Sequence, residues 1–131
     1  HSEGLLAPNL DDPDLGVFLS ALFYITDELE PVLKRYFFPH RYAIRDTDHS
    51  AVREISLASV CECLSVINDR LTSSGPFHLG NRYSLPDLML SFWMCSIMDH
   101  EAIAGFKAIH NCRKMVEKRP NIEGLFHDLY A

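Results

Sequence analysis

The stretch that decides the fold reads Phe77-His78-Leu79-Gly80-Asn81-Arg82-Tyr83-Ser84-Leu85-Pro86-Asp87-Leu88. Ser84 and Asp87 have the spacing of a capping box, in which the hydroxyl and the carboxylate each accept a backbone N–H of the other residue. Tyr83 and Leu88 flank this box at the positions of a hydrophobic staple. Gly80 suits a turn with positive φ. The stretch therefore predicts a turn followed by a firmly nucleated helix that begins at Ser84.

The helix that follows is apolar on almost every side. Its apolar residues include Leu85, Leu88, Met89, Leu90, Phe92, Trp93, Met94 and Ile97. A helix of this kind is normally covered by its neighbours. We therefore expect it to be the central helix of the domain.

Two longer helices are predicted ahead of the central one. The first shows apolar residues at steps of three and four, namely Leu15, Phe18, Leu22, Ile25, Leu29, Val32 and Tyr36. It is expected to start after Asp12, to kink at Pro31 and to end before Pro39. The second is expected to be capped within residues 46–48 and to end at residues 72–76. Its predicted inner face consists of Val52, Ile55, Ser59, Cys63, Ile67 and Leu71.

A fourth helix is predicted from Ile103 to Lys118, and a short last helix after Pro120. The last helix would use Ile122, Leu125, Phe126 and Leu129. No segment alternates apolar and polar residues as a half-buried strand does. The expected fold class is therefore all-α, a compact bundle of about five helices around a central buried helix.

Composition limits the classes of function. The chain has 131 residues, 47% of them apolar, and 12 Lys+Arg against 18 Asp+Glu give a net charge of −6. These values fit one globular domain and argue against disorder. The acidic balance argues against nucleic-acid binding, which favours clustered basic residues. No segment is long and apolar enough to predict a membrane span or a signal peptide, so a cytoplasmic location is expected.

No metal site or catalytic pair is expected from the spacing of the polar residues. The cysteines at positions 61, 63, 95 and 112 do not have ligand spacing, and reduced thiols are the simpler interpretation. Ser84 and Asp87 lack a neighbouring histidine that would make them a nucleophile–base arrangement, so we interpret them as structural. The basic segment Pro39–Arg45 is interpreted as a solvated connection, with an anionic ligand or partner as the alternative.

Leu79-Gly80, Tyr83-Ser84 and Asp87 together resemble the signature "LxGxxxSxAD" that opens the central helix of the C-terminal domain of cytosolic glutathione S-transferases. Residues 4–8 resemble the interdomain linker of that family. Residues 118–122 resemble its "xRPxV" step between late helices. The resemblance covers essentially the whole chain, with residues 1–131 as one helical domain and residues 1–11 as a linker-like segment. Pro86 departs from the usual alanine, which a first turn tolerates.

The resemblance implies a role in conjugating glutathione to apolar electrophiles. Glutathione would be the co-substrate of the full protein, gripped by a preceding thioredoxin-like domain. That domain is expected to be absent from this chain, which alone would bind no cofactor and be inactive. Some relatives contact glutathione through basic residues in the first helix, and Glu30-Pro31 makes such a contact unexpected here.

The same resemblance implies which residues would act. Tyr24, Phe92 and Ser96 are predicted to line the hydrophobic-substrate side of the cleft, although core packing is an equal interpretation for Phe92. A homodimer through the first two helices is also implied. The alternatives are a non-catalytic docking module of the same fold and, less favoured, an unrelated helical ligand-binding protein.

Overall fold

The computed structural model describes residues 6–125 of the chain. In chain order, its elements are α1 (Leu15–Tyr24), a π-helical turn η1 (Ile25–Leu29), α2 (Glu30–Phe37), the 3₁₀ turns η2 (Pro39–Arg41) and η3 (Asp46–Asp48), α3 (His49–Ser74), α4 (Leu85–Met94), the 3₁₀ turn η4 (Glu101–Ile103) and α5 (Lys107–Glu117). Within residues 6–125 no strand forms, and only isolated bridges occur in residues 77–82. The predicted all-α class is confirmed.

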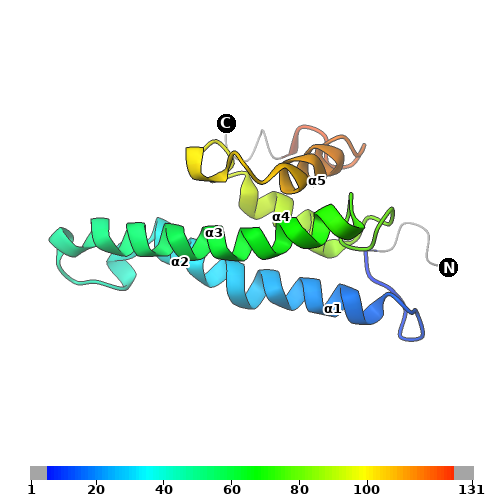
Figure 1. The fold of residues 1–131 in the computed structure, drawn as a ribbon, viewed down its shortest axis with the longest axis horizontal. Helices are drawn as coiled ribbons and strands as arrows, with labels where there is room; N and C mark the ends of the chain where they lie inside the picture. The colour runs from blue at the N-terminus through cyan, green and yellow to red at the C-terminus, as the bar shows by residue number, and fades with distance from the viewer. Residues whose placement is uncertain (1–5, 126–131) are drawn as a thin grey trace.

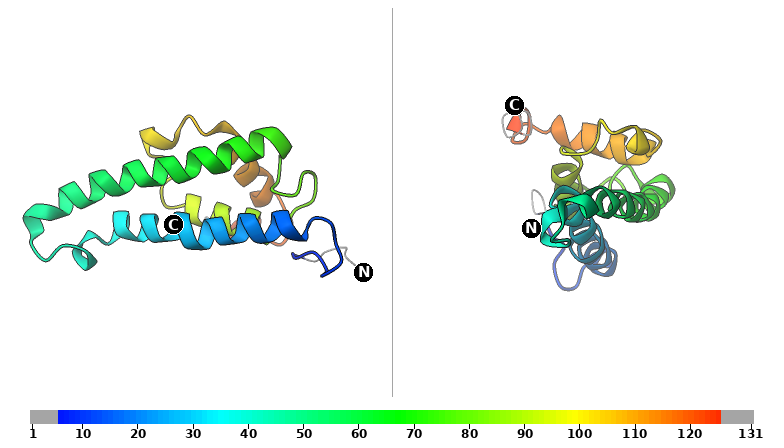
Figure 2. Two further views of the ribbon diagram at one scale, coloured as in Figure 1. Left: turned by 60° about the horizontal axis from the view of Figure 1, so that its bottom comes forward. Right: turned by 90° about the vertical axis from the view of Figure 1, so that its left-hand side faces the viewer.

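The elements form one long helical pair with two shorter helices against it (Figure 1). The first three elements, α1, η1 and α2, follow one another without a break and lie antiparallel to α3. This pair runs the length of the molecule in Figure 1 and in the left view of Figure 2. Helices α4 and α5 pack against one another, and α5 also packs on α3. Four helical units are therefore present in the described part of the chain, arranged as a compact bundle.

The interruption expected at Pro31 takes a different form from a proline kink. A single π-helical turn ends at Leu29, and the N–H of Glu30 bonds to the carbonyl of Ile25, five residues back. Pro31 then stands in the first turn of α2, where a missing N–H is tolerated. The wider turn keeps Ile25, Leu29 and Leu33 fully buried along one face. The helix continues in register with the core because the π turn absorbs the irregularity.

In the first half of α3, the residues that are buried differ from the predicted inner face. Ile55 is 64% exposed, whereas Ser56 and Val60 are fully buried. The buried hydroxyl of Ser56 accepts a hydrogen bond from the guanidinium of Arg35 on α2 at 2.8 Å and donates to the carbonyl of Val52 at 2.6 Å. The second half agrees with the expectation, since Cys63, Ile67 and Leu71 are buried. Ser56 therefore occupies the contact between α2 and α3, whereas the apolar pattern predicted Ile55 there.

Helix α4 lies inside the bundle, as predicted, against α1, η1 and α5. Its fully buried residues are Asp87, Leu90, Ser91 and Met94. Tyr83 and Leu88 both pack against the same core cluster. Phe92 is an exception to the expected apolar cover, because 39% of it is exposed.

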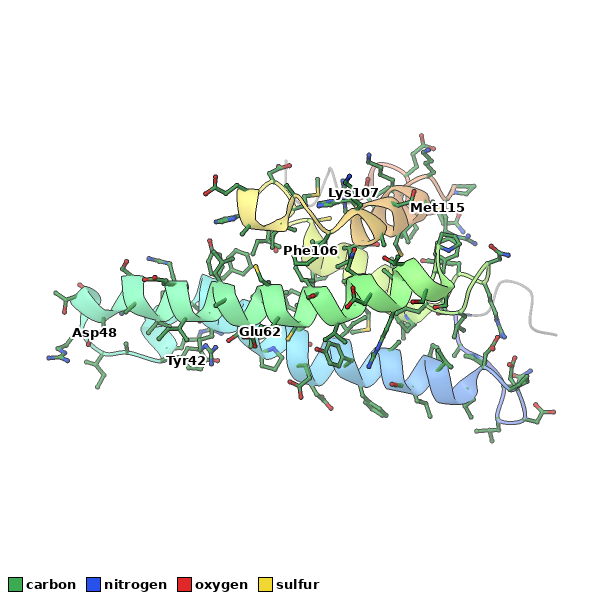
Figure 3. The ribbon with its side chains drawn as sticks, in the orientation of Figure 1. Tyr42, Asp48, Glu62, Phe106, Lys107 and Met115 are labelled. Atoms are coloured by element: carbon green, nitrogen blue, oxygen red, sulfur yellow. The ribbon has the colours of Figure 1, made fainter. Side chains whose placement is uncertain are left out.

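The C-terminal part differs from the expectation at its boundaries. The predicted helix from Ile103 is divided into η4 and α5, with Phe106 between them. Figure 3 shows Phe106 where the chain enters α5, facing the body of the bundle. Residues 118–124 form turns and a bend, Leu125 is helical, and the predicted last helix beyond it lies outside the described residues. Within residues 6–125, no helix is long and apolar enough to cross a membrane.

Candidate functional site

The start of α4 is organised around the fully buried carboxylate of Asp87. Its Oδ2 accepts the backbone N–H of Ser84 at 2.9 Å and lies 3.4 Å from the Ser84 hydroxyl. Ser84 has extended backbone and directly precedes α4. The two residues therefore face each other as the residues of a capping box do.

The other carboxylate oxygen of Asp87 reaches back into the loop before α4. Its Oδ1 lies 2.8 Å from the backbone nitrogen of His78 and 2.7 Å from Nδ1 of the same residue. The thiol of Cys112 on α5 lies 3.7 Å away. Burial and the charge of Asp87 raise the pKa of the Cys112 thiol, which keeps it protonated and able to donate. Asp87 therefore joins α4, α5 and the loop through one carboxyl group.

The pairing of Asp87 with His78 differs from the expectation that no histidine lies beside the capping box. No neighbouring histidine was expected, but the turn at residues 77–82 folds back and brings one into contact. Gly80 has φ +75° there, as predicted for this turn. The available signal was the position of His78, nine residues before Asp87 and inside the quoted stretch.

The loop is also attached to the N-terminal segment. Arg82 donates to Asp12 at 2.7 Å and lies 3.5 Å from Asp14. The hydrogen bond from Arg82 is the main cause that lowers the pKa of Asp12. Closer to the N-terminus, the backbone N–H of Leu85 donates to the carbonyl of Leu6 at 2.9 Å. The linker-like segment is therefore connected to the first residue of α4.

The three residues predicted to contact substrate lie on different parts of the fold. Tyr24 is half-buried at the end of α1, and its ring lies 4.9 Å from the guanidinium of Arg70 on α3. Burial raises the pKa of the Tyr24 hydroxyl, and its contact with Cys63 adds to this effect. Phe92 stacks edge-on against Trp93. Ser96 lies past the end of α4 and donates to the carbonyl of Trp93 at 2.8 Å. Their role as substrate contacts stays a prediction.

A cleft of about 570 Å³ opens beside Tyr24 rather than around all three residues. Its walls are the first half of α1, the last turns of α3 and the loop before α4. The lining residues are Gly16, Val17, Ser20, Ala21, Asp69, Arg70, Ser73, Ser74 and His78. Arg70 connects this cleft to Tyr24 through the ring contact. The apolar periodicity could not predict the cleft, because it depends on how far apart α1 and α3 lie.

No group of three or more His, Cys, Asp or Glu side chains suitable for a metal ion occurs in residues 6–125. All four cysteines have free thiols. At the position where a basic glutathione contact was considered, Glu30 pairs with Lys34 at 2.8 Å.

Comparison with known proteins supports the fold. No family model matches the sequence, and no curated protein matches it either. A solved structure of a glutathione transferase from Methylococcus capsulatus str. Bath matches with a TM-score of 0.73 and 22% identity. The match covers 94% of this chain and 58% of that chain. The chain therefore has a glutathione transferase-like helical fold, consistent with the C-terminal helical domain that its sequence resembles.

Proposed function

We propose that the chain acts as the helical domain of a glutathione transferase-like protein. In that role it supplies the apolar side of a cleft for electrophilic substrates, and glutathione is bound by a thioredoxin-like domain. The observation that carries the proposal is the fold match, which takes in nearly all of this chain but only 58% of the matched protein. An all-helical domain of this shape supports a role beside a second domain.

Tyr24, Phe92 and Ser96 are the residues proposed to meet the substrate. Phe92 supplies an exposed aromatic face, and Ser96 adds an exposed hydroxyl near the end of the same helical segment. Tyr24 holds its hydroxyl at the edge of the core beside Cys63. This combination of aromatic surface and hydroxyl groups suits an apolar acceptor with a polar substituent.

The proposal is tested on the native protein, captured with an antibody against this chain. Its intact mass is expected to exceed 15.0 kDa and its sequence to include a thioredoxin-like domain. It should conjugate glutathione to 1-chloro-2,4-dinitrobenzene, whereas the 131-residue chain alone should not. A native protein that carries no such domain and has no conjugating activity would contradict the proposal.

Variants in the native protein test the predicted contacts. Phe92→Ala and Tyr24→Phe are expected to raise the KM for the chloronitrobenzene about threefold or more, leaving the KM for glutathione unchanged. Tyr42→Phe is the matched control, because Tyr42 is exposed at the far end of the molecule from the start of α4 (Figure 3). If all three variants had equal kinetics, Phe92 and Tyr24 would not be substrate contacts.

A docking module is the second candidate, and one surface favours it. The connection between α2 and α3 exposes Phe38, Tyr42 and Ile44, with Ile44 fully exposed. Arg41 and Arg45 lie among them, so the segment combines apolar and basic groups suited to an acidic protein partner. A native protein that lacks a thioredoxin-like domain but copurifies with a partner through this segment would favour docking.

For either role, we propose that the protein is located in the cytoplasm.

A further inference from the structure

His78 is a buried imidazole held on one edge and open on the other. Only 6% of the residue is exposed, and its Nδ1 lies 2.7 Å from Asp87 Oδ1. The same oxygen accepts the backbone N–H of His78, so we assign it as the acceptor and Nδ1 as the protonated nitrogen. Nε2, on the opposite edge, has no hydrogen-bond partner among residues 6–125, and His78 lines the cleft. His78 therefore contributes to the lining of the cleft a side chain with unmet hydrogen-bonding capacity.

Arg70 supplies the positive charge of the same cleft. Its guanidinium is positioned over the ring of Tyr24, and within the described residues it forms no ion pair. A guanidinium placed in this way keeps N–H donors for a carboxylate. Asp69 also lines the cleft and formally balances the charge of Arg70. A singly charged carboxylate therefore fits better than a phosphate group with two charges.

The other residues that line the cleft indicate the size and polarity of the rest of the ligand. Val17 and Ala21 give an apolar wall, and Ser20 and Ser73 add hydroxyl groups. The volume, about 570 Å³, lies in the range of small-molecule sites. We propose that this cleft binds a small aromatic carboxylate bearing a hydroxyl group, with its carboxylate on Arg70 and its hydroxyl donating to Nε2 of His78. This site is separate from Phe92 and Ser96, and does not depend on the proposed transferase function.

The test is a binding titration of the isotope-labelled 131-residue chain, followed by the NMR shifts of its backbone amides. The probe is 4-hydroxyphenylacetate, compared with phenylacetate, which lacks the hydroxyl, and 4-hydroxyphenylethanol, which lacks the carboxylate. We expect saturable shifts at residues 16–21 and 69–78, and a Kd at least fivefold higher for each of the two truncated probes. Equal affinities for the three probes, or shifts confined to other residues, would overturn the proposal.

Two variants assign the contacts. Arg70→Gln should raise the Kd of 4-hydroxyphenylacetate at least tenfold. His78→Asn keeps an N–H donor for Asp87 but removes Nε2, so it should weaken the hydroxylated probe and leave phenylacetate unchanged. Arg53→Gln and His40→Asn, both exposed, are the matched controls and should change neither affinity. Unchanged binding in the first two variants would refute the assignment.

If His78→Asn does not fold, the comparison of the three probes on the unmodified chain still tests whether the cleft recognises both the carboxylate and the hydroxyl group. The assay contains no glutathione, so failure of this site leaves the transferase proposal standing. Loss of the transferase proposal would likewise leave a positive titration intact.

Discussion

At the scale of single residues, Asp87 has the largest expected effect on stability. Its carboxylate accepts from the backbone of Ser84 and from both the backbone and ring of His78, all in the core. Removing the acceptor leaves these donors buried without partners. Asp87→Ala is therefore expected to lower the free energy of unfolding by about 3–5 kcal/mol.

Urea unfolding followed by circular dichroism measures this change. Asp99→Ala is the matched control, because Asp99 is exposed, and it should shift the free energy of unfolding by less than about 0.5 kcal/mol. If Asp87→Ala were as stable as the control, the carboxylate would not organise the start of α4. That result would also favour a helical protein unrelated to glutathione transferases.

Asp12 gives a pH-dependent prediction at the same scale. Its hydrogen bond from Arg82 holds its pKa below the ordinary value of 3.8. A carboxyl with a lowered folded-state pKa adds stability above its unfolded pKa, and this stability is lost as the pH falls through the folded value. Asp12→Asn should therefore be less stable than the unmodified chain at pH 6, and the difference should shrink below pH 3.8.

Thermal unfolding at several pH values measures this difference. Asp12→Asn retains a side-chain oxygen for the N–H of Asp14, which Asp12 Oδ1 accepts at 2.8 Å, so the comparison isolates the charge. Asp11→Asn, an exposed neighbour, is the control and should show no such trend. A difference that stayed constant down to pH 2 would show that the ion pair with Arg82 does not form.

At the scale of elements, the end of α3 depends on a glycine. The N–H of Gly75 bonds to the carbonyl of Leu71, and a Cβ at residue 75 would collide with that carbonyl oxygen. Gly75→Ala should therefore displace the last turn of α3 and lower the free energy of unfolding by about 1–3 kcal/mol. Gly16, in the first turn of α1, has nothing near an added Cβ.

Gly16→Ala is the matched control and should raise the free energy of unfolding by about 0.5–1 kcal/mol, because alanine favours a helix. Urea unfolding of both variants gives the comparison. Opposite signs are expected for the two substitutions, and equal effects would mean that the close approach at Gly75 does not exist in solution.

The elements also show what the sequence could predict and why. The start of α4 was predictable, because the Ser84–Asp87 spacing and Gly80 are local signals. The buried position of Ser56 was not predictable, because it depends on Arg35, a residue on another helix. The partner of Asp87 depended on the path of the turn, which spacing alone does not define.

At the scale of the whole molecule, we propose a homodimer through the first two helices, with the outer face of α1 as part of the interface. Phe23 is 55% exposed, and Leu19, one helical turn before it, is 37% exposed. Neighbouring exposed apolar residues of this kind favour contact with a second copy. Phe23→Asp is expected to raise the dimer dissociation constant at least tenfold, because the charge would be desolvated at the interface.

Sedimentation velocity of the chain over a range of concentrations measures the association. Lys107 is exposed at the start of α5, outside the first two helices (Figure 3), and Lys107→Gln serves as the control with no expected effect. A monomer at all concentrations in the unmodified chain would contradict the dimer. The overall bundle was predictable from helical periodicity, whereas the cleft beside Arg70 depends on helix separation.

The hydrogen bond between Leu6 and Leu85 has a mechanical consequence. Together with the ion pair between Arg82 and Asp12, it ties the segment before α1 to the start of α4 at two points. A force applied to the chain at Leu6 would therefore act on these two contacts before it reached α1. A displacement of Leu6 or Asp12 would therefore be transmitted to the loop before α4 and to the first residue of α4, close to the buried side chain of Asp87.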